Sequence, residues 1–312
     1  MKLLIYTADG YDAHCNQALE AALTEILAPD TFILYLWSND NAVFIGKNQN
    51  AYLECNIDLL KSDGGVLTRR ITGGGAVYHD KGNLNYSFIA SKVLYDEKRQ
   101  FEIVLKAVNS LGFNAQLTGR NDITIDGRKF SGNAFFRGEY GLHHGTILIK
   151  SDYEKIAKYL TASKLKLISK NVQSVAARVI NLSEICPLIT KEAVSSALIH
   201  VAEEVLNAKA EYNTLDDFLG APGRRALLAR QHLFFTDETH ILGTDIYYDA
   251  AFERRFDWGL ADVRLKLSKS IITAAKIYSD CLDTELVERM ERKLVGRGAE
   301  EAVAFMEGIR YG

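Results

Sequence analysis

The chain has 312 residues, of which 47% are hydrophobic and 25% charged, a composition typical of a soluble globular protein with one large domain and a smaller one. Its 37 lysines and arginines against 40 aspartates and glutamates give a formal net charge of -3. This balance excludes a general nucleic-acid binder, which needs a basic face. No apolar run approaches the roughly 18 residues of a membrane span. We therefore expect a cytoplasmic protein without nucleic acid or a membrane among its partners.

The hydrophobic pattern of the N-terminal half predicts two helices among several strands, and turn-forming residues separate these elements. We expect strands over 2–8, 31–38, 41–46, 76–80, 83–90, 121–125, 128–136 and 142–150, and helices over 15–27 and 99–112.

Three details of these elements follow from single residues. Asp12 or Asn16 is the expected N-cap of the first helix, and Gly112 ends the second. The runs 31–38 and 41–46 are separated by only two residues, which predicts that they pair with each other. The first of the two is almost continuously hydrophobic, so we expect both of its faces to be covered.

Residues 153–206 predict mostly helix, with an irregular stretch over 170–187. Because strands and helices do not alternate strictly along the chain, we expect an α+β fold with a mixed sheet rather than a doubly wound one. We place a domain boundary so that residues 1–244 form the large domain and residues 245–312 a small α/β module. That module begins with three strand-like stretches and ends in helices.

The segment "RRITGGGAVYHD" spans residues 69–80 and places three consecutive glycines beside two arginines. It is neither a P-loop nor a G-x-G-x-x-G fingerprint. Gly73, Gly74 and Gly75 leave backbone N–H groups free to line an anion site, and Arg70 offers a fork for a phosphate or carboxylate. The other interpretation is a glycine-rich surface turn with solvated arginines, and the segment by itself does not decide between the two.

A second segment, "GRNDITIDGRKFSGNAFF", predicts a β-hairpin closed by Asp126 and Gly127, the preferred type I′ turn. The turn sets three cross-strand pairs, which are Ile125 with Arg128, Thr124 with Lys129, and Asp122 with Ser131. One face of the hairpin is then polar and the other apolar, with Asp122, Thr124, Lys129 and Ser131 opposite Ile123, Ile125 and Phe130. Either the polar face meets solvent or a ligand runs past Lys129, where the following residues are small.

The histidines and cysteines predict no metal centre. His143 and His144 are adjacent in a strand, so they point to opposite faces, and we expect one to be packed and the other exposed. His79 and Asp80 have no further ligand at a useful spacing. No two cysteines form a C-x-x-C pair, and we expect all four to be buried and inert, namely Cys15, Cys55, Cys186 and Cys281.

Taken together, "RRITGGGAVYHDKGNLNYSF", "GRNDITIDGRKFSGNA" and "HHGT" resemble the lipoate–protein ligase A family, in that order and spacing. The likeness begins at "NQALE" and "LWSNDNAVFIGKNQN" and continues through "SVAARVINL" into "RFDWG" and "ITAAKIYSD". It therefore covers nearly the whole chain, including the small C-terminal module of the bacterial two-domain ligases. Three long motifs in register are far more specific than any one of them.

The resemblance implies a catalytic domain of the class II aminoacyl-tRNA synthetase and biotin ligase type. Such enzymes use ATP and Mg²⁺ to convert lipoate into lipoyl-AMP, with no tightly bound prosthetic group. They then transfer the lipoyl group to a lysine of an apo lipoyl domain, on the E2 subunit of a 2-oxoacid dehydrogenase or on the glycine cleavage H protein.

The resemblance also assigns roles to particular residues. Lys129 is the expected catalytic residue, acting by charge on both lipoate and phosphate. The ATP and adenylate contacts fall on Arg70, Gly75, Ala76, Val77, Tyr78 and Lys129. The lipoate contacts fall on Lys129, Gly73, Gly74 and His79, and in second place on Asn83, with Phe44, Val77 and Phe88 as apolar lining. Asp122 either binds Mg²⁺ with the pyrophosphate or orients Lys129.

Three other functions compete with this one. A lipoyl or octanoyl transferase uses an acyl group that is already activated, and its cysteine-dependent branch needs a nucleophilic cysteine, which the motif loops lack. A biotin ligase has different motifs around its adenylate loop. A non-catalytic binding protein would have no need of Arg70, the glycines and Lys129 together.

Overall fold

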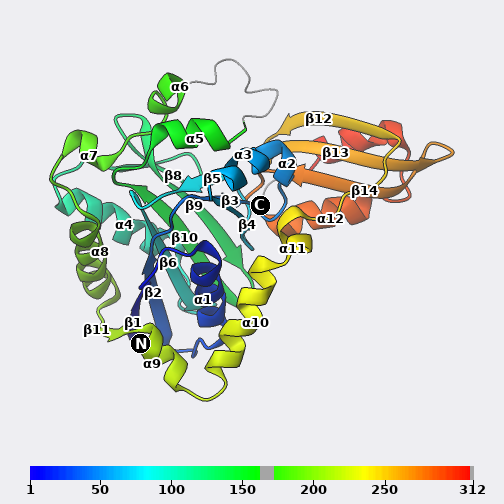
Figure 1. Ribbon diagram of the computed structural model, residues 1–312. Coiled ribbons are helices and arrows are strands. Elements are labelled where there is room, and N and C mark those ends of the chain that lie inside the picture. The colour runs from blue at the N-terminus through cyan, green and yellow to red at the C-terminus, as the bar shows by residue number, and fades with distance from the viewer. Residues whose placement is uncertain (162–171, 310–312) are drawn as a thin grey trace.

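The computed structural model describes residues 1–161 and 172–309 (Figure 1). Its centre is an eight-stranded sheet in which β1 runs parallel to both of its neighbours, while all other neighbours are antiparallel. The strand order is β11 (Ala210–Asn213), β1 (Lys2–Thr7), β2 (Thr31–Trp37), β6 (Asn83–Ser91), β10 (Tyr140–Leu148), β9 (Arg128–Arg137), β8 (Asp122–Ile125) and β7 (Gln116–Thr118). The predicted α+β class with a mixed sheet is confirmed.

Helices cover both faces of this sheet, as the apolar sequence of β2 predicts. Every residue of β2 is buried, and alternate side chains enter two different cores. Phe32 and Leu34 pack under α4 (Glu97–Ser110) and α8 (Lys191–Leu206). Tyr35 and Trp37 face the other side, where α1 (Ala13–Glu25) and α10 (Arg224–Thr236) lie (Figure 1).

Polar residues define the ends of the first two long helices. The side chain of Asp12 accepts the Cys15 N–H at 2.7 Å, so Asp12 rather than Asn16 is the N-cap of α1. Asp96 accepts two N–H groups at the start of α4. The helix ends at Ser110, and Gly112 follows with a φ of 90°, the left-handed position expected of it.

The predicted pairing of residues 31–38 with 41–46 is wrong. Both edges of β2 are occupied by β1 and β6. Asn41, with a φ of 46°, turns the chain away, and the next strand enters a separate three-stranded sheet. That sheet has the order β4 (Val66–Arg69), β3 (Ala42–Ile45) and β5 (Val77–His79), and two short helices precede β4, α2 (Ala51–Glu54) and α3 (Ile57–Ser62).

Between β10 and residue 249, the described part of the chain forms helices and a single strand, the edge strand β11. The predicted helical stretch 153–206 includes residues 162–171, which lie outside the described residues. None of the helices described is long and apolar enough to cross a membrane. Besides α8 and α10, this part contains α5 (Tyr153–Tyr159), α6 (Val172–Ala176), α7 (Leu182–Ile185), α9 (Leu215–Gly220) and α11 (Glu238–Leu242).

The C-terminal module is a three-stranded antiparallel meander followed by helices, as expected, with a core of its own around Trp258 and Met290. It lies beside the large domain in Figure 1, and its backbone contacts that domain where the Ser279 N–H donates to the Asn48 carbonyl at 2.8 Å. Its elements are β12 (Ala250–Phe256), β13 (Gly259–Ser268), β14 (Ile271–Ser279), α12 (Thr284–Leu294), the 3₁₀ turn η2 (Ala299–Glu301) and α13 (Ala302–Glu307).

Arg69, at the end of β4, ties several chain segments together. Its buried guanidinium donates to three carbonyls at the end of α11 and to three in the loop after β3, at 2.7 to 3.3 Å. Burial lowers the pKa of Arg69 to about 10, so the group stays charged at neutral pH. The carbonyls belong to His240, Ile241, Leu242, Gly46, Lys47 and Gln49.

We predict that Arg69→Leu lowers the free energy of unfolding by about 3 kcal/mol or more, because it leaves several buried carbonyls without a donor. Urea denaturation followed by circular dichroism measures this. Arg69→Lys keeps the charge but offers only three donors, so its loss should fall between wild type and Arg69→Leu. Equal stability of all three proteins would contradict the structural role given to the guanidinium.

Candidate active site

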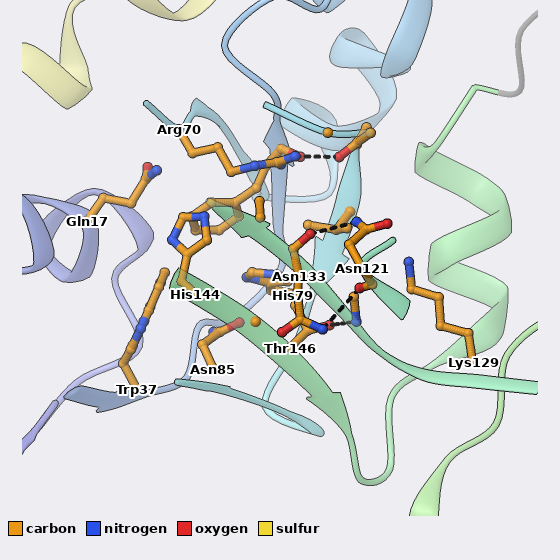
Figure 2. A pocket seen from close by; sticks show the side chains of 18 residues that line it. Gln17, Trp37, Arg70, His79, Asn85, Asn121, Lys129, Asn133, His144 and Thr146 are labelled. Atoms are coloured by element: carbon orange, nitrogen blue, oxygen red, sulfur yellow. Dashed lines mark hydrogen bonds between the residues drawn. The ribbon is translucent and has the colours of Figure 1, made fainter. Parts of the chain in front are cut away.

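A pocket of about 120 Å³ lies on the sheet face that α1 covers, beneath the loop that joins β4 to β5 (Figure 2). We call residues 70–76 the glycine loop. The floor of the pocket follows one row of cross-strand neighbours, because Asn85 stands opposite both Trp37 and Thr146, and the Gly132 N–H donates to Thr146 Oγ1 at 3.2 Å. Four strands of the sheet, β2, β6, β10 and β9, thus contribute to one floor.

Two of the three glycines are required, each for a different reason. A Cβ on Gly73 would lie 2.2 Å from the Cys281 carbonyl oxygen, so the C-terminal module leaves no room for a side chain. Gly74 has a φ of 92°, which side chains disfavour, and its N–H donates to that same carbonyl at 3.1 Å. At Gly75, by contrast, a Cβ would meet nothing within 4 Å, so the protein itself leaves room for a side chain there, at the border of the pocket.

Arg70 holds the glycine loop from below. Its guanidinium is buried, and Nη2 donates to the carbonyls of Gly73 at 2.7 Å and Gly75 at 2.8 Å. Nε donates to Thr72 Oγ1 at 3.1 Å, and Nη1 to the Phe44 carbonyl at 3.2 Å. Burial lowers the pKa of Arg70 to about 10, which still leaves it positively charged. The surface-turn interpretation of the loop is therefore wrong, because Arg70 is not solvated.

The hairpin places Lys129 at the pocket. Asp126 and Gly127 have φ values of 50° and 75°, and Lys129 stands opposite Thr124, so the predicted turn and the first two pairs are confirmed. Lys129 lines the pocket, and its Nζ lies 2.7 Å from Asp122 Oδ1. A Cβ at Gly132 would lie 2.6 Å from that Nζ, so the glycine leaves room for the lysine ammonium.

The predicted pair of Asp122 with Ser131 is wrong. The register shifts between Ile123 and Thr124, so Asp122 stands opposite Gly132 and Ile123 opposite Ser131. The extra residue in this β-bulge is Phe130, which is fully buried. The bulge keeps the apolar side chains in the core but leaves Ser131 buried, rather than on the polar face with Asp122.

Comparison with known proteins identifies the family. Residues 12–203 match the lipoyl protein ligase A/B catalytic domain, and residues 246–303 match the bacterial lipoate protein ligase C-terminus. A lipoate-protein ligase A of Psychrobacter cryohalolentis is 35% identical over 300 residues, covering 94% of this chain and 88% of that protein. The chain belongs to the lipoyl protein ligase A/B family.

Solved structures agree with this assignment. LipL1 of P. falciparum in complex with lipoate matches with a TM-score of 0.81 and 30% identity, over 99% of this chain and 94% of that one. A lipoate-protein ligase A bound with ATP matches with a TM-score of 0.66 and 26% identity, over 78% and 98% of the two chains. The fold predicted from the family resemblance is therefore confirmed.

A buried hydrogen-bond chain beneath the pocket was not anticipated from the sequence. His144 Nε2 lies 2.7 Å from Thr72 Oγ1, and its Nδ1 lies 2.9 Å from Glu20 Oε1. Ser87 Oγ donates to the same Glu20 oxygen at 2.5 Å, and Trp37 Nε1 donates to Ser87 Oγ at 2.9 Å. These hydrogen bonds connect α1 to the glycine loop. The signal in the sequence was Glu20, a charged residue within the otherwise apolar run 18–23 of α1.

The expectation that one of the two adjacent histidines is exposed is wrong. They do point to opposite faces, but helices cover both faces of the sheet, so His143 is 0% and His144 8% exposed. His144 lines the pocket. His143 enters the opposite core, against rings that include Phe101 and Phe135, and its Nε2 lies 2.8 Å from Asn133 Oδ1.

The His79–Asp80 pair divides into a pocket residue and a structural one. His79 lines the pocket, with its ring centroid 4.3 Å from that of Phe44. Burial, with smaller effects from Arg70 and His144, lowers the pKa of His79 to about 3. The Asp80 carboxylate instead accepts backbone N–H groups, from Gly82 at 2.8 Å and Asp152 at 2.7 Å.

The remaining expected site residues separate into those that line the pocket and those that lie beside it. Gly73, Tyr78 and Asp122 are not among the lining residues, although each neighbours one that is. Asn83 is buried next to the floor and donates to Asn85 Oδ1 at 2.9 Å. Phe88 belongs to the core on the other face of the sheet, so its expected place in the apolar lining is wrong. The expected site residues that do line the pocket are Phe44, Arg70, Gly74, Gly75, Ala76, Val77, His79 and Lys129.

The cysteines lie outside the pocket, and the expectation that all are buried is partly wrong. Cys55 and Cys281 are buried, whereas Cys15 is exposed and Cys186 intermediate. Burial raises the pKa of the Cys55 and Cys281 thiols to about 12. Cys15 lies in the first turn of α1, on the side of the helix that faces solvent.

We predict that Gly132→Ala leaves the fold intact but lowers the rate at which lipoate is activated with ATP by roughly tenfold or more. The reason is that the added methyl group displaces the Lys129 ammonium from its place in the pocket. Thermal unfolding and substrate-dependent ATP–pyrophosphate exchange measure the two effects. Gly220→Ala is the matched control, since a Cβ there meets nothing within 4 Å. Full activity of Gly132→Ala would contradict the role given to this glycine.

Proposed function

We propose that this chain is an ATP-dependent lipoate–protein ligase that forms lipoyl-AMP and transfers the lipoyl group to a lysine of a lipoyl domain. The observation that carries the proposal is the position of Lys129, whose side chain lines the same pocket as the backbone of Gly74 and Gly75. Membership of the family and the lipoate-bound and ATP-bound relatives support both substrates.

In the first half-reaction, a carboxylate oxygen of lipoate attacks the α-phosphorus of ATP, and pyrophosphate leaves with the electrons of the broken P–O bond. Negative charge gathers on the phosphoryl oxygens in the transition state, so fixed positive charge stabilises it. We propose that Lys129 supplies this charge directly. Arg70 instead acts on the glycine loop, whose shape it fixes by donating to the loop carbonyls.

We propose that the backbone of the glycine loop and β5 holds the adenylate, through Gly75, Ala76, Val77 and Tyr78. The Tyr78 side chain is buried away from the pocket, with its hydroxyl donating to Asn41 Oδ1 at 3.0 Å, so only its backbone suits this role. Gly73 and Gly74 shape the lipoate end. The apolar walls for the acyl chain are Phe44, Trp37 and Val77.

Asp122 could bind Mg²⁺ or orient Lys129, and its ion pair with Lys129 favours the orienting role. Its carboxylate is a hard oxygen ligand of the kind that Mg²⁺ takes together with phosphate oxygens, and Mg²⁺ would neutralise charge on the leaving pyrophosphate. In this structure the carboxylate contacts Lys129 Nζ at 2.7 Å. We therefore propose that Asp122 orients Lys129 toward the pocket.

In the second half-reaction, the lysine amine of the acceptor attacks the acyl carbon, the bond to the phosphate oxygen breaks, and AMP and a proton are released. We propose apo lipoyl domains of 2-oxoacid dehydrogenase E2 subunits and the H protein as acceptors.

We propose that the protein acts in the reducing cytoplasm, because all four of its cysteines are free. We also propose residues 1–244 as the catalytic domain and 245–312 as an accessory domain that covers the glycine loop.

A transferase that uses a pre-activated acyl group is the alternative. Its cysteine-dependent branch needs a thiol at the acyl group, but within the described residues no cysteine lines the pocket. The relative that is bound with ATP also supports an enzyme that activates the acyl group itself. The ligase is therefore the better-supported function.

We predict that wild-type protein catalyses lipoate-dependent ATP–pyrophosphate exchange without any acceptor protein, and that Lys129→Ala lowers the exchange rate by about 100-fold or more. Lys106 is a surface lysine that pairs with Glu102, so Lys106→Ala is the control and should match wild type.

Mass spectrometry of an apo lipoyl domain incubated with lipoate, ATP and Mg²⁺ should show one added lipoyl group. A transferase would show neither exchange nor this addition with free lipoate. A near-normal exchange rate for Lys129→Ala would overturn the role of the lysine.

A further inference from the structure

His79 is buried in the pocket wall with only one of its ring nitrogens engaged. Nδ1 lies 2.9 Å from Asn39 Nδ2, whereas Nε2 has no hydrogen-bond partner among the described residues. Asn85, another lining residue, likewise has an unpartnered Nδ2 in that part of the chain. Buried polar groups are normally satisfied, so two such nitrogens in one pocket indicate a ligand with hydrogen-bond acceptors.

The neighbouring amides determine which nitrogen of His79 carries the hydrogen. Asn16 Nδ2 lies 2.9 Å from the Ser38 carbonyl and 3.3 Å from the Gly10 carbonyl, and since carbonyls only accept, this fixes the orientation of the Asn16 amide. The same Nδ2 donates to Asn39 Oδ1 at 3.0 Å. Asn39 must then present its NH₂ group to His79.

An amide NH₂ only donates, so Nδ1 of His79 accepts and must be unprotonated. The single hydrogen of the neutral ring therefore sits on Nε2. Burial lowers the pKa of His79 to about 3, which keeps the ring neutral at physiological pH. Packing against Phe44 fixes the plane of the ring in the pocket wall.

We propose that Asn39 is a positioning residue that fixes His79 as an Nε2–H donor, and that this N–H donates to a hydrogen-bond acceptor on the bound acyl substrate. The acceptor is either a carboxyl oxygen or a dithiolane sulfur. The inference rests on the proposed function, because it takes the acyl ligand of the pocket to be lipoate. It gives His79 a defined chemical role in substrate recognition.

Long-range ¹H–¹⁵N NMR correlation on labelled wild-type protein without substrate tests the tautomer. We expect a protonated Nε2 and an unprotonated Nδ1, and we expect Asn39→Leu to give a mixture of tautomers. A wild-type ring protonated at Nδ1 would overturn the inference. This measurement needs no activity, so it stands even if the proposed function fails.

Steady-state exchange kinetics test the contact with the substrate. His79→Phe keeps the ring but removes the N–H, so we expect KM for lipoate to rise roughly tenfold while kcat changes much less. His79→Gln restores a donor near Nε2, and KM should return toward the wild-type value. Asn39→Leu should give a smaller rise. An unchanged KM in folded His79→Phe would overturn the contact, whereas absence of exchange in wild type would instead overturn the proposed function.

Octanoate, which lacks the dithiolane, identifies the acceptor. An equal rise in KM for lipoate and octanoate places the N–H on the carboxyl oxygen. A rise for lipoate alone places it on the ring sulfur. Thermal unfolding of each variant confirms that the compared proteins are folded.

Discussion

The glycine loop depends on one buried guanidinium. Loop carbonyls that face inward need donors, and Arg70 supplies them to Gly73 and Gly75. Its third contact, with the Phe44 carbonyl, joins the loop to β3. With these carbonyls bonded below it, the loop can present an open backbone at Gly75 to the pocket. Arg70 therefore acts on the ligand largely through the shape it imposes on the loop.

That shape is connected to the rest of the molecule on two sides. Thr72 and His144 link the loop to Glu20 on α1, so the floor and the roof of the pocket share one hydrogen-bond chain. On the other side the Cys281 carbonyl of the C-terminal module accepts the Gly74 N–H. The position of the small module thus bears directly on the backbone that we propose to hold the adenylate.

Side chains along the strands of the central sheet point alternately to the two faces, so the sheet builds a core on one face and the pocket on the other. On β6, Tyr86 and Phe88 build the core under α4 and α8, while Asn85 and Ser87 face the pocket side. The polar residues on that side are mostly paired with one another. His79 Nε2 is an exception, and an exception at a binding pocket is where a ligand contact is expected.

Local sequence alone determined the left-handed Gly112 after α4, the type I′ turn at Asp126 and Gly127, and the burial of β2 on both faces, because each depends on neighbouring residues or on periodicity. For the N-cap of α1 it left Asp12 and Asn16 open. The long motifs in register determined the family. Only the tertiary structure decided that β2 and β3 enter different sheets, that a bulge at Phe130 changes the partner of Asp122, and that Glu20 meets His144. These outcomes rest on contacts between residues far apart in the chain, and no local pattern encodes such contacts.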